Sequence, residues 1–217
     1  MNVAKLLNRY FQNSSSLPTI EVFDNENIYD VYVDIVNTLK ASPEIEIGVL
    51  QLLSYCFYEI LDNVLTHSGK KSGTVLMHYE PTRNSVKILV ADDGIGIRES
   101  LSQNQTYAGI TEPEAVQLCV QDRVTDGKGM GFGLYSTMCL IKNAGIMMEI
   151  HSGRHVLRTD GHKIEVCETT PWQGTIIFFE LHTDKEISPN NILEGRTDAE
   201  SEFNDTFIDT SELDDLW

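Results

Sequence analysis

The feature that most constrains this chain is a run of alternating glycines, Gly127, Gly129, Gly131 and Gly133, followed by a helical pattern from Leu134 to Asn143. Glycine at every second position destabilises the interior of a strand or a helix, because glycine has the most backbone freedom to lose. Such a run suits a loop that passes close to a ligand. The helix after it offers free N–H groups and the positive end of its dipole, which favour an anion such as phosphate.

Length and charge narrow the class of protein. The chain has 217 residues, which suits one domain with an appendage. Its net charge of -17 disfavours a nucleic-acid backbone as a partner. From Thr183 onward there are 11 acidic and 2 basic residues, which predicts a disordered acidic tail. We therefore expect an extension over 1–44 that packs on the core, an ordered domain over 45–182 and a tail over 183–217.

The four cysteines form no CxxC pair, so neither a zinc site nor a redox motif is indicated. Each is expected to be a reduced core residue: Cys56, Cys119, Cys139 and Cys167. The sequence shows no signal peptide and no apolar run of membrane length. These features predict a cytoplasmic protein without a membrane segment.

The strongest helical pattern runs from Ile45 to His67. It carries a broad apolar stripe on one face and a polar ridge at every fourth residue, and the ridge includes Glu59, Asn63 and His67. A short helix within residues 1–16, a strand over Thr19–Phe23 and a helix over Ile28–Lys40 are expected before it.

Two strands, Thr74–Glu80 and Ser85–Ala91, are expected after this helix, and the second runs into Asp92. A polar, irregular segment over Arg98–Thr111 and a helix from Glu112 to about Asp122 should follow. The whole span 97–126 is long for a plain connection, which is typical of a binding loop. Four further strands are expected, with hairpin turns near Gly153 and Asp160–Gly161: Ile146–His151, about Arg154–Arg158, Lys163–Cys167 and Gly174–Leu181.

Each block of candidate functional residues is weak by itself. A Glu and an Asn on a helix usually belong to its solvated face, an Asp-Gly pair is usually only a turn, and a glycine-rich loop is often a linker. Their order along the chain and the elements that carry them are far more specific.

In that order the blocks resemble the GHKL superfamily of gyrase-type topoisomerases, heat-shock chaperones, histidine kinases and mismatch-repair proteins, which share the Bergerat ATP-binding fold. The resemblance covers about residues 45–182. Glu59 to His67 looks like the N box, Asp92 to Gly96 like the first glycine box, Gly127 to Leu134 like the second, and Gly174 to Leu181 like the closing strand. It implies an α/β two-layer sandwich with a mixed, mostly antiparallel sheet, helices on one face and a long ATP lid over 97–126.

The resemblance also implies individual roles. Asn63 would coordinate Mg²⁺ through its amide oxygen, and Glu59 would orient or deprotonate the nucleophile. His67 would lie near the phosphates or the lid. Asp92 would accept a hydrogen bond from the adenine amino group, supported by Thr175.

The remaining implied contacts are with the phosphates and the base, and Lys128 could add a positive charge there. The residues expected at the nucleotide are Asn63, His67, Asp92, Gly94, Gly96, Ile97, Lys128, Gly129, Met130, Gly131, Phe132, Gly133, Leu134 and Thr175. A Walker-type loop is excluded because Lys128 is followed by glycine rather than Ser or Thr. A dinucleotide fingerprint fails because the glycine spacing is two throughout.

Within the superfamily, the layout is closest to anti-sigma-factor-type serine kinases. Nothing upstream resembles a helical unit with a phospho-acceptor histidine, and nothing downstream resembles a transducer domain. The resemblance therefore implies a protein kinase that acts on a separate small protein. Two alternatives stay open, a nucleotide-gated module that switches partners through its lid and a remnant that binds ATP without turnover.

The acidic tail departs from that pattern, because residues 203–217 interleave apolar side chains with acids. Such a segment is either solubilising disorder or a docking strip for a partner or for the chain itself. A homodimer also remains open.

Overall fold

The structure is a computed structural model, and it describes residues 2–12, 14, 16–41, 45, 47–128, 133–144 and 146–183. Gly129, Met130, Gly131 and Phe132 lie outside the described residues, as does the tail from residue 184 with its expected docking segment. Within the described ranges, no helix is long and apolar enough to cross a membrane.

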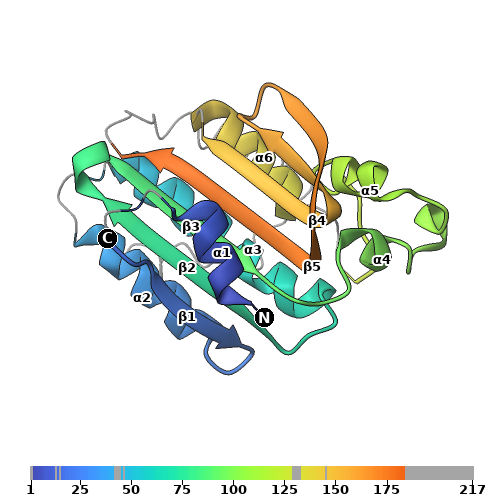
Figure 1. The fold of residues 1–217 in the computed structure, drawn as a ribbon, viewed down its shortest axis with the longest axis horizontal. Coiled ribbons are helices and arrows are strands. Elements are labelled where there is room, and N and C mark those ends of the chain that lie inside the picture. Colours follow the sequence, from blue (N-terminus) through green and yellow to red (C-terminus); the bar gives the residue numbers. More distant parts are fainter. Residues whose placement is uncertain are drawn as a thin grey trace, which may run out of the picture.

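A five-stranded sheet forms the centre of the fold (Figure 1), in the order β1-β2-β3-β5-β4. Its strands are β1 (Thr19–Asp24), β2 (Ser72–Glu80), β3 (Ser85–Ala91), β4 (Met147–Thr159) and β5 (Ile164–His182). All four pairings are antiparallel, so the mixed character that we expected is wrong for the described strands. The short 3₁₀ turn η1 (Pro81–Arg83) joins β2 to β3.

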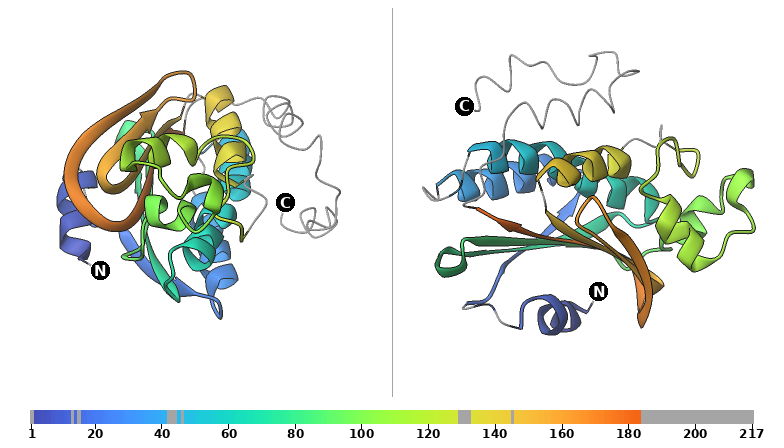
Figure 2. Two further views of the ribbon diagram at one scale, coloured as in Figure 1. Left: turned by 90° about the vertical axis from the view of Figure 1, so that its right-hand side faces the viewer. Right: turned by 90° about the horizontal axis from the view of Figure 1, so that it is seen from above.

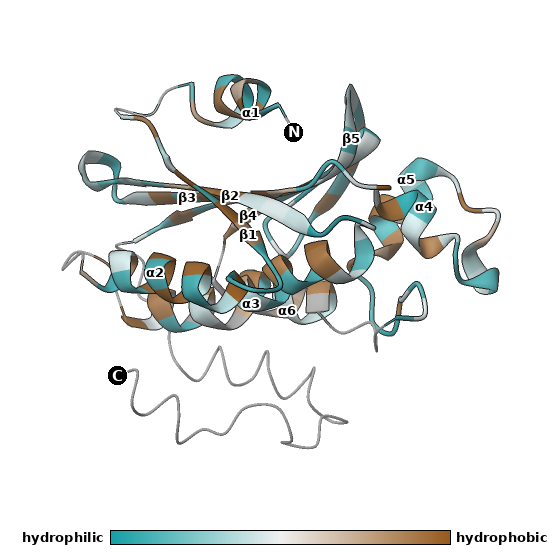
Figure 3. Ribbon diagram, turned by 90° about the horizontal axis from the view of Figure 1, so that it is seen from below, coloured by the Kyte–Doolittle hydropathy of each residue, from teal (hydrophilic) through white to brown (hydrophobic). Residues whose placement is uncertain are grey.

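Three helices cover one face of the sheet (Figure 3): α2 (Ile28–Lys40), α3 (Ile47–His67) and α6 (Gly133–Ala144). Alternation along the strands directs Met77 of β2, Val90 of β3 and Phe179 of β5 to this face, where they pack with Ile60 and Leu61 of α3. Both α3 residues are fully buried. The expected two-layer α/β sandwich is confirmed.

The opposite face of the sheet is covered by α1 (Val3–Tyr10), as Figure 2 shows. Leu6, Tyr10 and Phe11 bury apolar surface there against Leu89 and Phe178 of the sheet. The Tyr10 and Phe178 ring centroids lie 4.7 Å apart. We call this side the outer face. The expectation that helices cover only one face therefore omitted α1.

The segment between β3 and α6 lies beyond one end of the sheet (Figure 1). It contains α4 (Ile97–Leu101), the 3₁₀ turn η2 (Gln105–Tyr107) and α5 (Glu112–Leu118). Thr111 and Glu114 form a capping box at the start of α5. The expected irregular stretch over Arg98–Thr111 is thus partly helical, and α5 ends four residues before Asp122.

Strands β4 and β5 replace the four short strands that we expected, so the predicted hairpin turn near Gly153 is wrong. Gly153 lies inside β4, opposite Trp172, where the register shifts. Its φ of 61° is accommodated by a β-bulge, which bends a strand without reversing the chain. The turn at Asp160–Gly161 is confirmed, because β4 ends at Thr159 and β5 begins at Ile164.

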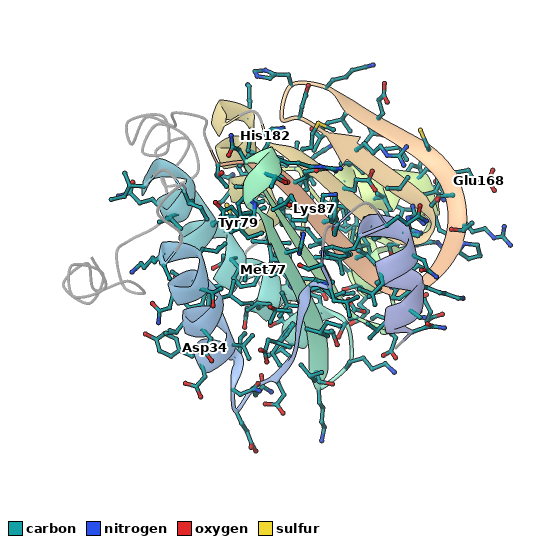
Figure 4. All side chains as sticks on the ribbon, turned by 60° about the vertical axis from the view of Figure 1, so that its left-hand side comes forward. Asp34, Met77, Tyr79, Lys87, Glu168 and His182 are labelled. Carbon is teal, nitrogen blue, oxygen red and sulfur yellow. The ribbon has the colours of Figure 1, made fainter. Side chains whose placement is uncertain are left out.

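Beyond the bulge, β4 and β5 pair only with each other and form a two-stranded arm. Figure 4 labels Glu168 on this arm and His182 at the other end of β5. Cys167 is exposed on the arm, so the expectation of a core cysteine is wrong there, whereas Cys56 is buried.

Candidate functional site

One cavity of about 320 Å³ lies among α3, the end of β3, the middle of β5 and the segment 97–126. Many of the residues singled out by the sequence line it: Glu59, Asn63, His67, Asp92, Gly96, Ile97, Lys128, Leu134 and Thr175. They come from positions up to 116 residues apart, from Glu59 to Thr175. The fold therefore brings the separate sequence blocks to one concave surface, which is the usual form of a small-molecule site.

The polar ridge of α3 forms one wall of the cavity. Helical spacing puts Glu59, Asn63 and His67 on the same side of α3, while its apolar stripe faces the sheet. The amide nitrogen of Asn63 is buried and has no hydrogen-bond partner among the described residues. A buried amide without a partner is costly, so this group is suited to a ligand.

Glu59 lies at the open side of this wall. Its side chain is exposed to solvent, yet the protein around the carboxyl raises its pKa, and the nearby Asp62 carboxylate adds to the shift. A carboxylate whose pKa is shifted toward neutrality accepts a proton more readily than an ordinary one.

Asp92 forms the closed end of the cavity, directly after β3. The residue is 3% exposed, and burial raises the pKa of its carboxyl to about 6. Backbone hydrogen bonds from Gly94 and Thr175 act in the opposite direction, and the Gly94 amide donates to Oδ1 at 2.8 Å. The turn requires glycine at position 94, because a Cβ there would collide with the Ser68 carbonyl oxygen.

Strand β5 holds the loop after Asp92 from one side. The Asp92 amide donates to the Thr175 carbonyl at 2.9 Å. Ser152 Oγ accepts from the Ile97 amide and donates to the Gly174 carbonyl, both at 2.9 Å. The start of α4 is therefore tied to the end of the sheet, close to Gly96 and Thr175.

Asp126 is a site residue that the sequence reasoning missed. Its Oδ2 lies 2.9 Å from His67 Nδ1 and accepts a 2.8 Å hydrogen bond from Ser100 Oγ. Burial acts to raise the pKa of Asp126, but these contacts and the Lys128 amide outweigh it and lower the pKa. The residue directly precedes the glycine run, which is the one signal that could have drawn attention to it.

The other missed lining residues are mostly apolar or small, so their types carry no distinct chemical signal. They are Ile60, Asp62, Val64, Thr66, Ser68, Val90, Ser100, Leu101, Cys119, Val124, Thr125 and Ile177. The apolar members give the cavity the kind of surface on which a flat base can pack.

Gly94, Gly133 and Lys128 are also among the residues expected at the nucleotide. Gly94 does not line the cavity but supports Asp92 through its amide. Gly133 begins α6. Lys128 Nζ donates to the Thr66 carbonyl at 3.4 Å and lies 3.7 Å from Asp126 Oδ2, so its charge is at the cavity.

The described residues contain no cluster of three or more His, Cys, Asp or Glu side chains that could hold a metal ion. Mg²⁺ in nucleotide sites needs no such cluster, because it takes one or two protein oxygens and completes its shell with phosphate and water. The side-chain amide of Asn63 can present its oxygen to the cavity by a flip of the group.

A comparison with families of known proteins finds a match that covers most of the chain. The family of histidine kinase-, DNA gyrase B-, and HSP90-like ATPases matches residues 48–185. This range includes every residue of the cavity wall described above. Among curated proteins, no sequence matches this chain.

Proposed function

This chain belongs to the family of histidine kinase-, DNA gyrase B-, and HSP90-like ATPases and is an ATP-binding module of that family, and from that premise we propose that it is a protein kinase. It transfers the γ-phosphate of ATP to a Ser or Thr residue of a separate small protein. The observation that carries the proposal is the placement of Glu59 and Asn63 one helical turn apart on the wall of the cavity that Asp92 closes.

The base binds at the Asp92 end of the cavity. Oδ2 of the Asp92 carboxylate accepts a hydrogen bond from the adenine amino group, because Oδ1 already accepts one from the Gly94 amide. Guanine presents a carbonyl at the same place, so the site selects adenine. The Thr175 hydroxyl, beside Asp92, supports this contact.

The phosphates extend toward α3 and Lys128. Asn63 offers its buried amide there, and Lys128 adds a positive charge. Mg²⁺, when bound, would be held by Asn63 together with phosphate oxygens and water, and it would neutralise charge on the phosphates.

Glu59 acts on the incoming hydroxyl. The Glu59 carboxylate takes the proton of the Ser or Thr hydroxyl while the hydroxyl oxygen attacks the γ-phosphorus. The bond between the γ-phosphorus and the bridging oxygen breaks, and ADP leaves. The raised pKa of Glu59 makes it a stronger base for this step than an ordinary glutamate.

The test is transfer of label from γ-labelled ATP to a co-encoded small protein. We expect Glu59→Gln to reduce labelling by a factor of about 100 or more, since a general base contributes about 10² to 10⁴. The dissociation constant for ATP should stay nearly unchanged. Glu26→Gln, on an exposed loop after β1, is the matched control and should label normally. Undiminished transfer in Glu59→Gln would show that Glu59 is not the base.

The contacts of the segment 97–126 favour a second function, a nucleotide-gated switch. This segment touches the cavity through Ser100 and Asp126 and touches β4 through Glu112, whose Oε2 lies 3.1 Å from His155 Nδ1. Nucleotide in the cavity would thereby alter the surface that a partner meets. Phosphate release without any labelled protein would favour this switch over the kinase.

A further inference from the structure

The bulge between β4 and β5 joins parts of the molecule that are far apart in sequence. At this point Trp172 lies opposite Gly153, and Gly174 has a φ of 93°. The backbone of Gly174 lies so close to the loop after β3 that a Cβ there would meet Asp92 Oδ1 at 2.5 Å and the Gly94 nitrogen at 2.7 Å. The segment from Trp172 to Gly174 therefore lies tightly against the loop that carries Asp92.

Two side chains of this segment hold the backbone of that loop. Trp172 Nε1 donates a 3.0 Å hydrogen bond to the Asp92 carbonyl, and Gln173 Nε2 donates to the Gly94 carbonyl. Asp92 and Gly94 lie outside any helix or strand, so such contacts determine where the carboxylate sits. Without the indole N–H, the buried Asp92 carbonyl would lose a partner.

The same tryptophan packs on the outer face, against the apolar cluster to which α1 contributes. Trp172 packs against the cluster that Leu6 and Phe178 form, as do Val3 and Leu7 of α1. Its indole therefore spans from the outer-face cluster to the loop that carries Asp92.

Arg9 of α1 fastens the helix to the strand segment just before Trp172. Its guanidinium donates to Thr169 Oγ1 at 3.0 Å and to Thr170 Oγ1 at 3.1 Å. These bonds link residues about 160 positions apart in sequence. Hydrogen bonds thus join α1 to Thr169 and Thr170, strand β5 leads from Thr170 to Trp172, and a hydrogen bond joins Trp172 to the Asp92 carbonyl.

We propose that Trp172 is a positioning residue for adenine recognition and that α1, docked through Arg9, holds it in place. With α1 docked, Asp92 is aligned for the adenine amino group. With α1 displaced, the Asp92 loop loses its support and adenine nucleotides bind less tightly. This inference rests on the proposed nucleotide site at Asp92.

A purely structural role for Trp172 makes a different prediction. If the indole only filled space on the outer face, its loss would lower thermal stability and weaken the binding of all nucleotides alike. If it positions Asp92, its loss weakens ATP more than inosine triphosphate, whose base carries a carbonyl where adenine carries the amino group. The ratio of the two dissociation constants therefore separates the two roles.

The test is a double-mutant cycle in the full chain, with dissociation constants for ATP and inosine triphosphate measured by calorimetry. Trp172→Phe keeps an aromatic ring and removes the donor, and Arg9→Gln removes the fastening of α1. We expect each to weaken ATP by about fivefold to tenfold, the effect of one lost hydrogen bond, and to lower the preference for ATP. We expect the double variant to be no weaker than the worse single variant.

Two further variants complete the design. Thr169→Val with Thr170→Val removes the acceptors of Arg9 on an exposed arm and should reproduce Arg9→Gln, even if Trp172→Phe fails to fold. Arg83→Gln, on the exposed turn between β2 and β3, is the matched control and should bind ATP normally.

Additive effects, or an unchanged preference for ATP, would overturn the inference. The Asp92→Asn variant then distinguishes an error in the link through Trp172 from an error in the nucleotide site itself. If Asp92→Asn abolishes ATP binding while the other variants bind normally, the nucleotide site stands and only the link through Trp172 is wrong. If Asp92→Asn also binds ATP normally, the proposed site itself is wrong.

Discussion

His67 at the end of α3 and Asp126 just before the glycine run are joined by a 2.9 Å contact between Nδ1 and Oδ2. The same carboxylate accepts from Ser100 Oγ, and its Oδ1 accepts from the Lys128 amide at 3.0 Å. One buried acid therefore connects α3, α4 and the end of the segment 97–126. We call this group the latch.

We predict that Asp126→Asn speeds the release of nucleotide. The amide keeps the size of the carboxylate but cannot accept from His67, Ser100 and the Lys128 amide with the strength of a charged group. An effect of about one to two such hydrogen bonds corresponds to a release rate about 10 to 100 times faster. Stopped-flow displacement of a fluorescent ATP analogue measures it.

The control for the latch is Asp122→Asn, an exposed position in the segment 97–126 whose carboxylate lies 3.8 Å from Arg123 Nε. Its release rate should match that of the unmodified chain, because exposed pairs contribute little. Equal release rates in Asp126→Asn and the unmodified chain would show that the latch does not retain the nucleotide.

Much of the fold could be predicted from the sequence because it rests on local periodicity. The apolar stripe of α3 favours a helix and the apolar run that ends at Ala91 favours a strand, and the structure places β3 at the expected Ser85–Ala91. Gly153 misled the prediction, because a glycine in a strand pattern fits a turn and a bulge equally well. The pairing of Gly153 with Trp172 decides between them, and pairing depends on residues far away in sequence.

The candidate site likewise contains some residues that could be predicted from the sequence and others that could not. Glu59, Asn63 and Asp92 could be named because their types and spacing carry a chemical meaning. Asp126 and Trp172 could not, because each acts through a partner that only the fold supplies, His67 for one and the Asp92 carbonyl for the other. The sequence pattern could not predict the side of the sheet on which α1 packs either, since α1 is amphipathic and fits either face.

We predict that Asp92→Asn stabilises the nucleotide-free protein. The carboxyl has a pKa of about 6 when folded, against a usual value of 3.8. An acid whose folded pKa is raised costs stability above that pKa, because the unfolded chain ionises first. At neutral pH the cost is at most about 3 kcal/mol, which the neutral amide avoids. Urea unfolding measures it.

The same substitution should weaken ATP binding by about tenfold or more. The side-chain amide of the variant would keep its oxygen toward the Gly94 amide and present its NH₂ group to the adenine amino group, so two donors would face each other. Asp93→Asn is the matched control on the neighbouring residue, whose carboxylate lies 3.5 Å from Lys70 Nζ near the surface. A less stable variant with normal ATP binding would contradict both the pKa argument and the assignment of Asp92.

We predict, finally, that His151 makes the protein less stable as the pH falls from about 6.5 to about 4. His151 is 1% exposed on β4, opposite Ile176, and neither ring nitrogen has a hydrogen-bond partner among the described residues. Burial, with help from the Arg9 charge, lowers its pKa to about 4, while the backbone at Gly153 and Thr170 acts in the opposite direction. Between these pH values the unfolded chain binds a proton that the folded chain refuses, so unfolding is favoured by up to about 3 kcal/mol.

The measurement is the free energy of unfolding in urea from about pH 7 to about pH 4, for the unmodified chain and for His151→Leu. The leucine cannot bind a proton, so the stability of the variant relative to the unmodified chain should rise as the pH falls. Asp92 contributes a slope of opposite sign in part of this range, but it is present in both chains and cancels. His162→Leu, in the exposed turn between β4 and β5, should keep the slope of the unmodified chain. Parallel curves for His151→Leu and the unmodified chain would show that His151 is protonated as easily in the folded chain as in the unfolded one.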